Sequence, residues 1–351
     1  MCSLKNKLLD ILGNKKASHQ LFATFMLIKS RLFQVITNMN IEEDTLNFIS
    51  MFKTKENFLS KAKNGRILVS GMGGSGISGL IASALCNNMA NSQVIPWANY
   101  GLPNWINSED KIICISYSGN TAETLSAANR ALEIGCDLEV ITTGGQLEEL
   151  ALQNNLNVTK IEKGHQPRAA LPLLLKPLLY KIGIPNLDLQ IKEALDLEID
   201  IEKAKEISKK IKNKLPCIYS NGLLTPAGYR WRCQIEENAK VLAMNHELPE
   251  MNHNEIVGWT SPPNNMSVIL LRDNKEEKAI KKRMDATKEI AWTSKGIDTI
   301  EIYSKGKWPL TRIISLIFLG DLVSIELAKL NSVDPTPVEI IEDLKKILDG
   351  N

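Results

Sequence analysis

The chain has 351 residues, of which 44% are hydrophobic and 23% are charged, a composition typical of a soluble globular protein with room for two domains. The 42 basic and 40 acidic residues leave a net charge of +2, so the chain has no general electrostatic field that would attract nucleic acid or an anionic membrane. We therefore expect neither nucleic acid nor a membrane as a partner.

The first 40 residues contain the best candidate for a membrane span, residues 21–37, which is too short and carries Lys29 and Arg31 near its centre. No signal peptide is evident. We interpret residues 1–40 as an N-terminal extension, amphipathic or poorly ordered, or as a start-site artefact, since Met39 opens the first well-patterned segment. Six cysteines without a C-x-x-C pair, most of them in apolar runs, indicate reduced thiols and a cytoplasmic location.

Strand-like apolar runs alternate with helical patterns from residue 66 onward. The runs are RILVSG, QVIPWA, KIICISYSG, DLEVITTGG and VTKIE, then, after a charged helical stretch over residues 187–213, PCIYSNG, SVILLRD and DTIEIYS. Helices are predicted over residues 121–134, 146–153, 226–239, 276–292, 309–330 and 338–348. This alternation predicts parallel sheets covered on both faces. We predict an α/β fold of two doubly wound parallel-sheet domains in tandem, over residues 41–190 and 191–351, with similar strand–loop–helix openings.

The first strand-like run leads into a glycine loop, GMGGSG, with G-x-G-x-x-G spacing at Gly71, Gly73 and Gly76. A phosphate suits such a helix start, because unpaired N–H groups and the positive end of the helix dipole point there. A dinucleotide site would also need an acidic residue about 20 positions later to bind the ribose. The corresponding segment SQVIPWANYG has none, which argues against a dinucleotide.

A second loop, SYSGNTAET, follows the third strand-like run and gathers several hydroxyl groups. Hydroxyls donate hydrogen bonds to a phosphate monoester, and the carboxyl ends of parallel strands are where α/β folds bind ligands. The alternative interpretation is a turn followed by a helix N-cap. The two loops together favour a sugar phosphate over a nicotinamide. The residues predicted to bind the phosphate are Gly74, Ser75, Ser116, Ser118 and Thr121.

Seven short motifs of the chain resemble those of one known family. They are GMGGSG, SYSGNTAETL, ITTGG, PRAALP, QIEENAK, LPEMNHNEIVGW and IIEDLKKIL, which run in order from about Met39 to the C-terminus. They resemble the archaeal and bacterial bifunctional phosphoglucose/phosphomannose isomerases, which are built from two sugar-isomerase (SIS) domains. The resemblance implies that glucose-6-phosphate and mannose-6-phosphate are interconverted with fructose-6-phosphate through a cis-enediolate, with no cofactor and no metal.

The resemblance also implies roles for four further residues. Glu237 matches the family's carboxylate base, although Glu236 stands where the family has asparagine. His253 matches a histidine that assists ring opening and, in related isomerases, reaches in from the neighbouring subunit, which implies a homodimer with a shared active site. Arg168 would be the cation beside the enediolate oxygens, and Lys345 matches a lysine of the last helix that contacts the ring oxygen.

Plainer alternatives exist for these residues. A glutamate or arginine of a helix is commonly a solvated surface residue, and a lysine pair near a helix C-terminus compensates the helix dipole. His19, His165 and His246 are interpreted as incidental. A zinc site at His246 and His253 with nearby glutamates would be another alternative, but nothing in the mechanism requires a metal.

One departure from the family and two rival functions stay open. Val338 replaces a pocket threonine that has been linked to accepting both epimers, so it bears on dual specificity.

The first alternative function is that of a non-catalytic phosphosugar-binding SIS protein, which needs no base–histidine pair. The second is the isomerase half of a glucosamine-6-phosphate synthase, which needs a glutaminase domain, whereas only 70 residues precede the glycine loop.

Overall fold

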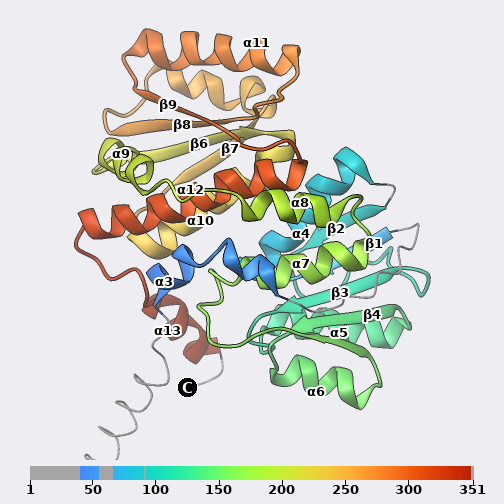
Figure 1. Cartoon of the computed structure of the whole chain (residues 1–351). Helices are drawn as coiled ribbons and strands as arrows, with labels where there is room; N and C mark the ends of the chain where they lie inside the picture. The colour runs from blue at the N-terminus through green and yellow to red at the C-terminus, as the bar shows by residue number, and fades with distance from the viewer. Residues whose placement is uncertain (1–39, 55–65, 91, 349–351) are drawn as a thin grey trace, which may run out of the picture. The chain divides into compact units, whose positions relative to one another are not determined.

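The computed structural model describes residues 40–54, 66–90 and 92–348, so most of the predicted N-terminal extension lies outside the described residues. Within those ranges the predicted strands form two parallel sheets (Figure 1). The first sheet has the order β2-β1-β3-β4-β5, with strands Gln93–Trp97, Arg66–Ser70, Lys111–Ser116, Asp137–Thr142 and Asn157–Lys160. The second has the order β7-β6-β8-β9, with strands Met244–Leu248, Leu215–Asn221, Met266–Arg272 and Thr299–Tyr303.

The strand order repeats between the two sheets. In each, the first strand along the chain lies between the second and the third, and the fourth pairs with the third. Equivalent helices connect the first two strands, namely α4 (Gly73–Met89) and α10 (Thr225–Ala239). The prediction of two parallel-sheet α/β halves in tandem is therefore confirmed.

The predicted helices are present with small shifts at their ends. Their bounds are α5 Ala122–Ile134, α6 Gly145–Gln153, α11 Lys278–Thr287, α12 Pro309–Leu330 and α13 Glu339–Leu348, and a short helix α3, Ile41–Leu46, opens the described chain. The structure adds helix α7, Leu171–Ile182, which was not predicted. The single helix predicted over residues 276–292 is divided: α11 ends at Thr287, and the chain continues as a π-helical turn, Lys288–Trp292.

The charged stretch over residues 187–213 divides into two helices, α8 (Leu187–Leu195) and α9 (Ile201–Ile211). Asp200 causes the restart, because its side chain accepts a hydrogen bond from the Lys203 N–H at 3.0 Å and caps the second helix. The predicted domain boundary at residues 190/191 falls within α8 and stays a prediction.

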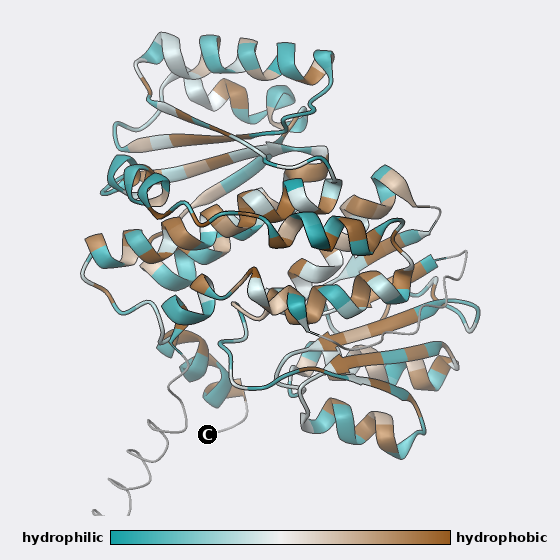
Figure 2. Ribbon diagram, in the orientation of Figure 1, coloured by the Kyte–Doolittle hydropathy of each residue, from teal (hydrophilic) through white to brown (hydrophobic). Residues whose placement is uncertain are grey.

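The two sheets share one hydrophobic core. Ile67 and Val69 of β1 enter it while Leu68 points to the opposite face, as the two-residue period of a strand requires. Ile218 of β6 and Ile269 of β8 enter the same core, together with side chains of α4, α7, α10 and α12. The outer faces pack separately against α5 and α6 in the first half and against α11 in the second. Figure 2 shows the strands as largely hydrophobic and α9 as largely hydrophilic. Because this core is shared, the described residues from Ile41 onward form one compact unit.

The described cysteines all carry free thiols, which agrees with the prediction of reduced cysteines. Burial raises the pKa of the Cys114 thiol to about 12 and that of Cys86 to about 11, so both stay protonated at neutral pH. Across the residues that the structure covers, we find no helix with the length and apolar content needed to cross a bilayer.

Candidate active site

The two predicted phosphate loops lie side by side at the carboxyl ends of β1 and β3. These strands pair directly and in parallel. The backbone N–H of Tyr117, in the second loop, donates to Oγ of Ser75, in the first, at 3.3 Å. Helices α4 and α5 both begin at this edge of the sheet, so the positive ends of two helix dipoles meet where a phosphate would bind.

The hydroxyls of the second loop are held by its own backbone. Ser116 Oγ accepts from the Gly119 N–H at 3.0 Å, and Ser118 Oγ accepts from the Asn120 N–H at 3.2 Å. A serine oxygen that accepts in this way keeps its own proton available as a donor. Thr121 occupies the N-cap of α5 without a side-chain capping bond and instead lies 2.8 Å from Ser116 Oγ. Such short-range bonds are also typical of Ser/Thr turns, so the role of this loop in binding a phosphate stays a prediction.

Gly74 brings the segment that carries Arg168 against the first loop. A Cβ atom at Gly74 would lie 2.9 Å from the Pro167 carbonyl oxygen and 3.0 Å from the Arg168 Cα. This approach is too close for any residue with a side chain, so the position requires glycine. Arg168, almost 100 residues away in sequence, is thereby placed next to the phosphate loops.

Arg168 also meets the predicted base. Its buried guanidinium donates from Nε to Asn238 Oδ1 at 2.8 Å, and the same Nε lies 4.0 Å from Glu237 Oε2. The Glu237 side chain is 28% exposed. Burial raises the pKa of Glu237 above its ordinary value, while the charges of Arg168 and Arg230 partly oppose that shift. A partly exposed carboxylate with a raised pKa beside a fixed cation is suited to proton transfer near neutral pH.

Part of the Arg168 guanidinium is already engaged. Nη2 donates to the carbonyl oxygens of Pro335 and Thr336 at 2.6 and 2.9 Å, whereas Nη1 reaches Gln166 Oε1 only at 3.5 Å. Because Nη2 holds the backbone that leads into α13, the Nη1 side is the part of the guanidinium that this geometry leaves for substrate oxygens.

Helix α10, which carries Glu237, is fixed by a buried ion pair. Arg230 donates to both carboxylate oxygens of Asp321 on α12 at 3.0 and 2.7 Å, and both side chains are 2% exposed. Arg230 Nη2 also donates to the Arg168 carbonyl oxygen at 2.8 Å. Glu236 lies elsewhere on the helix and approaches Arg232 at 3.7 Å, so of the two neighbouring glutamates only Glu237 meets Arg168.

Two residues that the sequence analysis did not identify complete this arrangement. Asn238 accepts from Arg168 and donates from Nδ2 to Ser324 Oγ at 2.9 Å. Lys240, at φ +58°, donates from Nζ to the Glu237 carbonyl and, at 2.7 Å, to the Pro337 carbonyl. The position of Asn238 directly after the predicted base was a signal that could have indicated it. No local pattern marks Lys240.

The structure does not bring His253 and Lys345 to this site through any contact in the chain. His253 ends the 3₁₀-helix Glu250–His253 and Lys345 lies in α13, and both side chains are exposed. Neither makes a hydrogen bond or ion pair with another described residue. The phosphate loops, Arg168 and Glu237 therefore come together within one chain, whereas the two residues assigned to ring opening do not join them.

Two of the histidines interpreted as incidental, His165 and His246, have carboxylate partners, whereas His19 lies outside the described residues. His165 Nδ1 lies 2.7 Å from Asp44 Oδ1, and His246 Nδ1 lies 2.7 Å from Glu255 Oε2. Each forms a pair and not a larger cluster, since the part of the chain described here holds no group of three or more His, Cys, Asp or Glu arranged to bind a metal ion.

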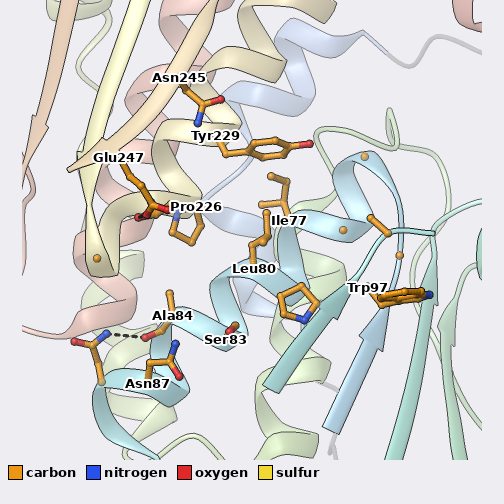
Figure 3. Close-up of a pocket in the computed structure, with 18 residues that line it drawn as sticks. Ile77, Leu80, Ser83, Ala84, Asn87, Trp97, Pro226, Tyr229, Asn245 and Glu247 are labelled. Atoms are coloured by element: carbon orange, nitrogen blue, oxygen red, sulfur yellow. Dashed lines mark hydrogen bonds between the residues drawn. The ribbon is translucent and has the colours of Figure 1, made fainter. Parts of the chain in front are cut away.

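A cavity of about 640 Å³ lies beside the first glycine loop, between α4, the end of β2, the start of α10 and β7 (Figure 3). Ile77 and Leu80 of α4 lie opposite Pro226 and Tyr229 of α10. Three glycines of the first loop line the cavity, but the residues predicted to bind substrate do not. The cavity is thus a neighbour of the predicted site and is largely apolar.

Comparison with solved structures supports the fold. A hypothetical protein from Thermus thermophilus superposes with a TM-score of 0.68 over 95% of this chain and 96% of its own, at 14% identity. Residues 200–348 match the family described as the bacterial phospho-glucose isomerase C-terminal SIS domain.

Two curated relatives cover most of the chain. A bifunctional phosphoglucose/phosphomannose isomerase from Caldicellulosiruptor bescii is 39% identical over 304 residues, which are 81% of this chain and 89% of the relative. One from Aquifex aeolicus is 38% identical over 288 residues, covering 80% and 90%. With its two parallel-sheet SIS halves, the chain belongs to the bifunctional phosphoglucose/phosphomannose isomerase family.

Proposed function

We propose that this protein interconverts glucose-6-phosphate and mannose-6-phosphate with fructose-6-phosphate, without a cofactor or a metal ion, in the cytoplasm. The family supports the reaction. The observation that carries the proposal for these residues is the packing of Gly74 against Pro167 and Arg168. That contact joins a pair of hydroxyl loops suited to a phosphate to a cation–carboxylate pair suited to moving a proton.

The 6-phosphate would bind between the two loops. Ser75, Ser116, Ser118 and Thr121 supply hydroxyl donors, and the backbone N–H groups at the starts of α4 and α5 supply further donors. Because these uncharged groups all donate hydrogen bonds, they can bind the phosphate dianion, and no lysine is needed. The remote phosphate then contributes binding energy that orients C1 and C2 of the sugar beside Glu237.

Glu237 is the proton carrier. Its carboxylate removes the proton from C2 of the open-chain aldose, which leaves a cis-enediolate, and the same carboxyl returns the proton to C1. The proton of the hydroxyl group on C2 passes to the oxygen on C1. The aldose and the ketose therefore contain the same atoms, and no oxidant or reductant is needed. Arg168, through Nη1, stabilises the negative charge that develops on the enediolate oxygens. Glucose-6-phosphate and mannose-6-phosphate lose their only difference at this planar intermediate.

Ring opening requires the two residues that lie apart from Glu237. We assign it to Lys345 and to His253 of the partner subunit, in a homodimer with shared sites. His253 is exposed, and its side chain makes no hydrogen bond or ion pair with another described residue. Both features support donation to a neighbouring chain. An imidazole can both donate and accept a proton, so it can exchange protons with the ring oxygen and the anomeric hydroxyl.

A coupled assay tests the reaction. Purified, EDTA-treated enzyme is offered glucose-6-phosphate and mannose-6-phosphate separately, and formation of fructose-6-phosphate is followed. We expect turnover of both sugars without added metal. Mannose-6-phosphate activity below a thousandth of the glucose-6-phosphate activity would contradict the dual specificity, and no turnover of either would leave only a sugar-phosphate-binding protein.

Mixing of inactive subunits tests the shared site. The variants Glu237→Gln and His253→Asn are prepared separately and then allowed to exchange subunits in equal amounts. If each site combines Glu237 of one chain with His253 of the other, half of the dimers carry one intact site, and the mixture recovers about a quarter of wild-type activity. No recovery from mixtures shown to contain heterodimers would place both residues in sites of a single chain.

A further inference from the structure

We propose that Asp44, on the short helix α3 that precedes both sheets, is a positioning residue for the isomerase site: through His165 and Gln166 it holds the loop that delivers Arg168. The inference rests on the proposed function and adds a part of the site that lies outside both sheets and their connecting helices.

Both carboxylate oxygens of Asp44 bind this loop. Oδ1 lies 2.7 Å from His165 Nδ1, and Oδ2 accepts from the Gln166 backbone N–H at 2.7 Å. Asp44 is 7% exposed, and a buried carboxylate is tolerated where its oxygens are satisfied in this way. Because a carboxylate only accepts hydrogen bonds, Nδ1 of His165 carries the proton in this pair. One side chain therefore fixes two consecutive residues of a segment, residues 161–170, that has no helix or strand.

The other side of the loop touches the phosphate site. The His165 backbone N–H donates to the Tyr117 hydroxyl at 3.0 Å, and the Tyr117 N–H donates to Ser75 Oγ. Pro167 lies against Gly74. The four residues from 165 to 168 thus connect α3 on one side to both phosphate loops on the other.

Arg168 follows directly in the chain. Only Pro167 separates it from Gln166. Asp44 holds the Gln166 backbone, and the Gln166 side-chain oxygen lies 3.5 Å from Arg168 Nη1, the part of the guanidinium left for substrate. A displacement of about 1 Å at a catalytic group can lower a rate by about 10²-fold. Asp44 therefore acts on catalysis through the placement of Arg168, without contacting the substrate.

The test separates placement from simple destabilisation. Asp44→Ala and Asp44→Asn are compared with Glu43→Gln, a change on the same helix at an exposed carboxylate. The readouts are kcat, KM for fructose-6-phosphate, and inhibition by two probes. One probe is inorganic phosphate, which reports the loops, and the other is an aldonic acid phosphate, whose planar carboxylate resembles the enediolate and reports the cation.

We expect Asp44→Ala to lower kcat by about 10- to 100-fold. The inhibition constant of the aldonic acid phosphate should rise by about tenfold, whereas that of inorganic phosphate should change by less than about twofold. Asp44→Asn keeps one hydrogen-bond acceptor, so its kcat should fall less than that of Asp44→Ala. Glu43→Gln should have the kcat, KM and inhibition constants of the wild type. The role of Asp44 is only structural if the Asp44→Ala enzyme, corrected for its folded fraction, keeps the wild-type kcat. The same follows if the inhibition constants of both probes rise by the same factor.

Substitutions at His165 keep the proposal testable where Asp44→Ala does not fold. His165→Asn retains an N–H donor near the position of Nδ1 and should recover most of the kcat that His165→Leu loses. Equal kcat values for these two variants would overturn the proposal. Failure of the proposed function gives a different result, namely a wild-type protein that binds inorganic phosphate but turns over no hexose phosphate.

Discussion

The two halves of the molecule share a strand order but place different chemistry at equivalent strand ends. After β3 comes the hydroxyl loop, residues 116–121. The counterpart strand, β8, ends at Arg272, and the guanidinium is bound by Glu276, Asp285 and Glu301 at 2.6, 2.6 and 2.7 Å. The first half thus presents donors for a ligand, whereas the second uses the same position for an internal ion cluster. Equivalent topology does not imply equivalent function, because the loops carry the chemistry.

The connecting helices differ in the same way. Helix α4 contributes its N-terminal end, where the glycine loop meets the phosphate site, while α10 contributes Glu237 near its C-terminal end. The proposed function therefore assigns phosphate binding to the first half and the reacting carboxylate to the second half. Four variants would break or sharpen this division, and they follow in order of decreasing expected effect.

Arg272→Met tests whether the ion cluster of the second half is only structural. Removing the guanidinium leaves partly buried carboxylates without their shared partner, and we expect a loss of about 3 kcal/mol in the free energy of unfolding, the lower end for a broken buried pair. The expected loss of unfolding free energy is at the lower end of this range because Asp285 also contacts Lys281 and Glu301 also contacts Lys288. Urea unfolding measures the loss. The kcat per folded molecule should not change, and a fall in kcat would give the cluster a role in the site.

Glu237→Gln tests whether the second half supplies the base. Glutamine keeps the shape and removes the basicity, so turnover should fall by at least about 10²-fold, or about 2.7 kcal/mol in the activation free energy. Steady-state kinetics with fructose-6-phosphate measure the effect. Retention of more than a tenth of the activity would move the role to Glu236 or to another residue.

The raised pKa of Glu237 adds a pH dependence to this prediction. Because burial raises it, the carboxyl is protonated and inactive over a wider acidic range, and kcat/KM should fall at a pH above the ordinary range of glutamate. The charged form also costs folding stability above the folded-state pKa. Glu237→Gln should therefore be at least as stable as the wild type at pH 7, and this advantage should shrink as the pH falls from the folded-state pKa of Glu237 to its lower unfolded-state pKa.

Ser118→Ala tests whether the first half supplies the phosphate site. Loss of one hydroxyl donor to a charged oxygen should cost about 1.5–3 kcal/mol, roughly 10- to 150-fold in kcat/KM. Ser118 is exposed, so the melting temperature should hardly change, in contrast to Arg272→Met. Unchanged KM and kcat would remove Ser118 from the phosphate site.

Val338→Thr should give the smallest effect. Val338 follows Pro337, whose carbonyl Lys240 holds beside Glu237, and threonine adds a hydroxyl at nearly the same volume. One additional hydrogen bond is worth about 0.5–1.5 kcal/mol, or roughly 2- to 13-fold. We expect the ratio of mannose-6-phosphate to glucose-6-phosphate activity to rise by that factor. An unchanged ratio would mean that this position does not control the choice of epimer.

The sequence alone was sufficient to predict the alternation of strands and helices and the pair of hydroxyl loops. Continuous apolar runs, glycine turns and helix starts are local patterns, and parallel neighbouring strands bring their carboxyl ends to one edge. For that reason Ser75 and the residues of the second loop could be predicted to lie together before any tertiary contact was known. Arg168 and Glu237 came from the family resemblance, and they lie beside each other in the fold.

Only the tertiary structure revealed what holds that pair in place. Asn238, Lys240 and Asp44 each act on residues or backbone that they meet through folding, and their contacts with Ser324, with Pro337 and with the loop before Arg168 span between 86 and 122 residues of sequence. No local pattern encodes such pairings, because they depend on how helices α3, α10 and α12 pack around one shared core. The same packing decided that Nη2 of the predicted catalytic arginine would be bound to the chain's own backbone.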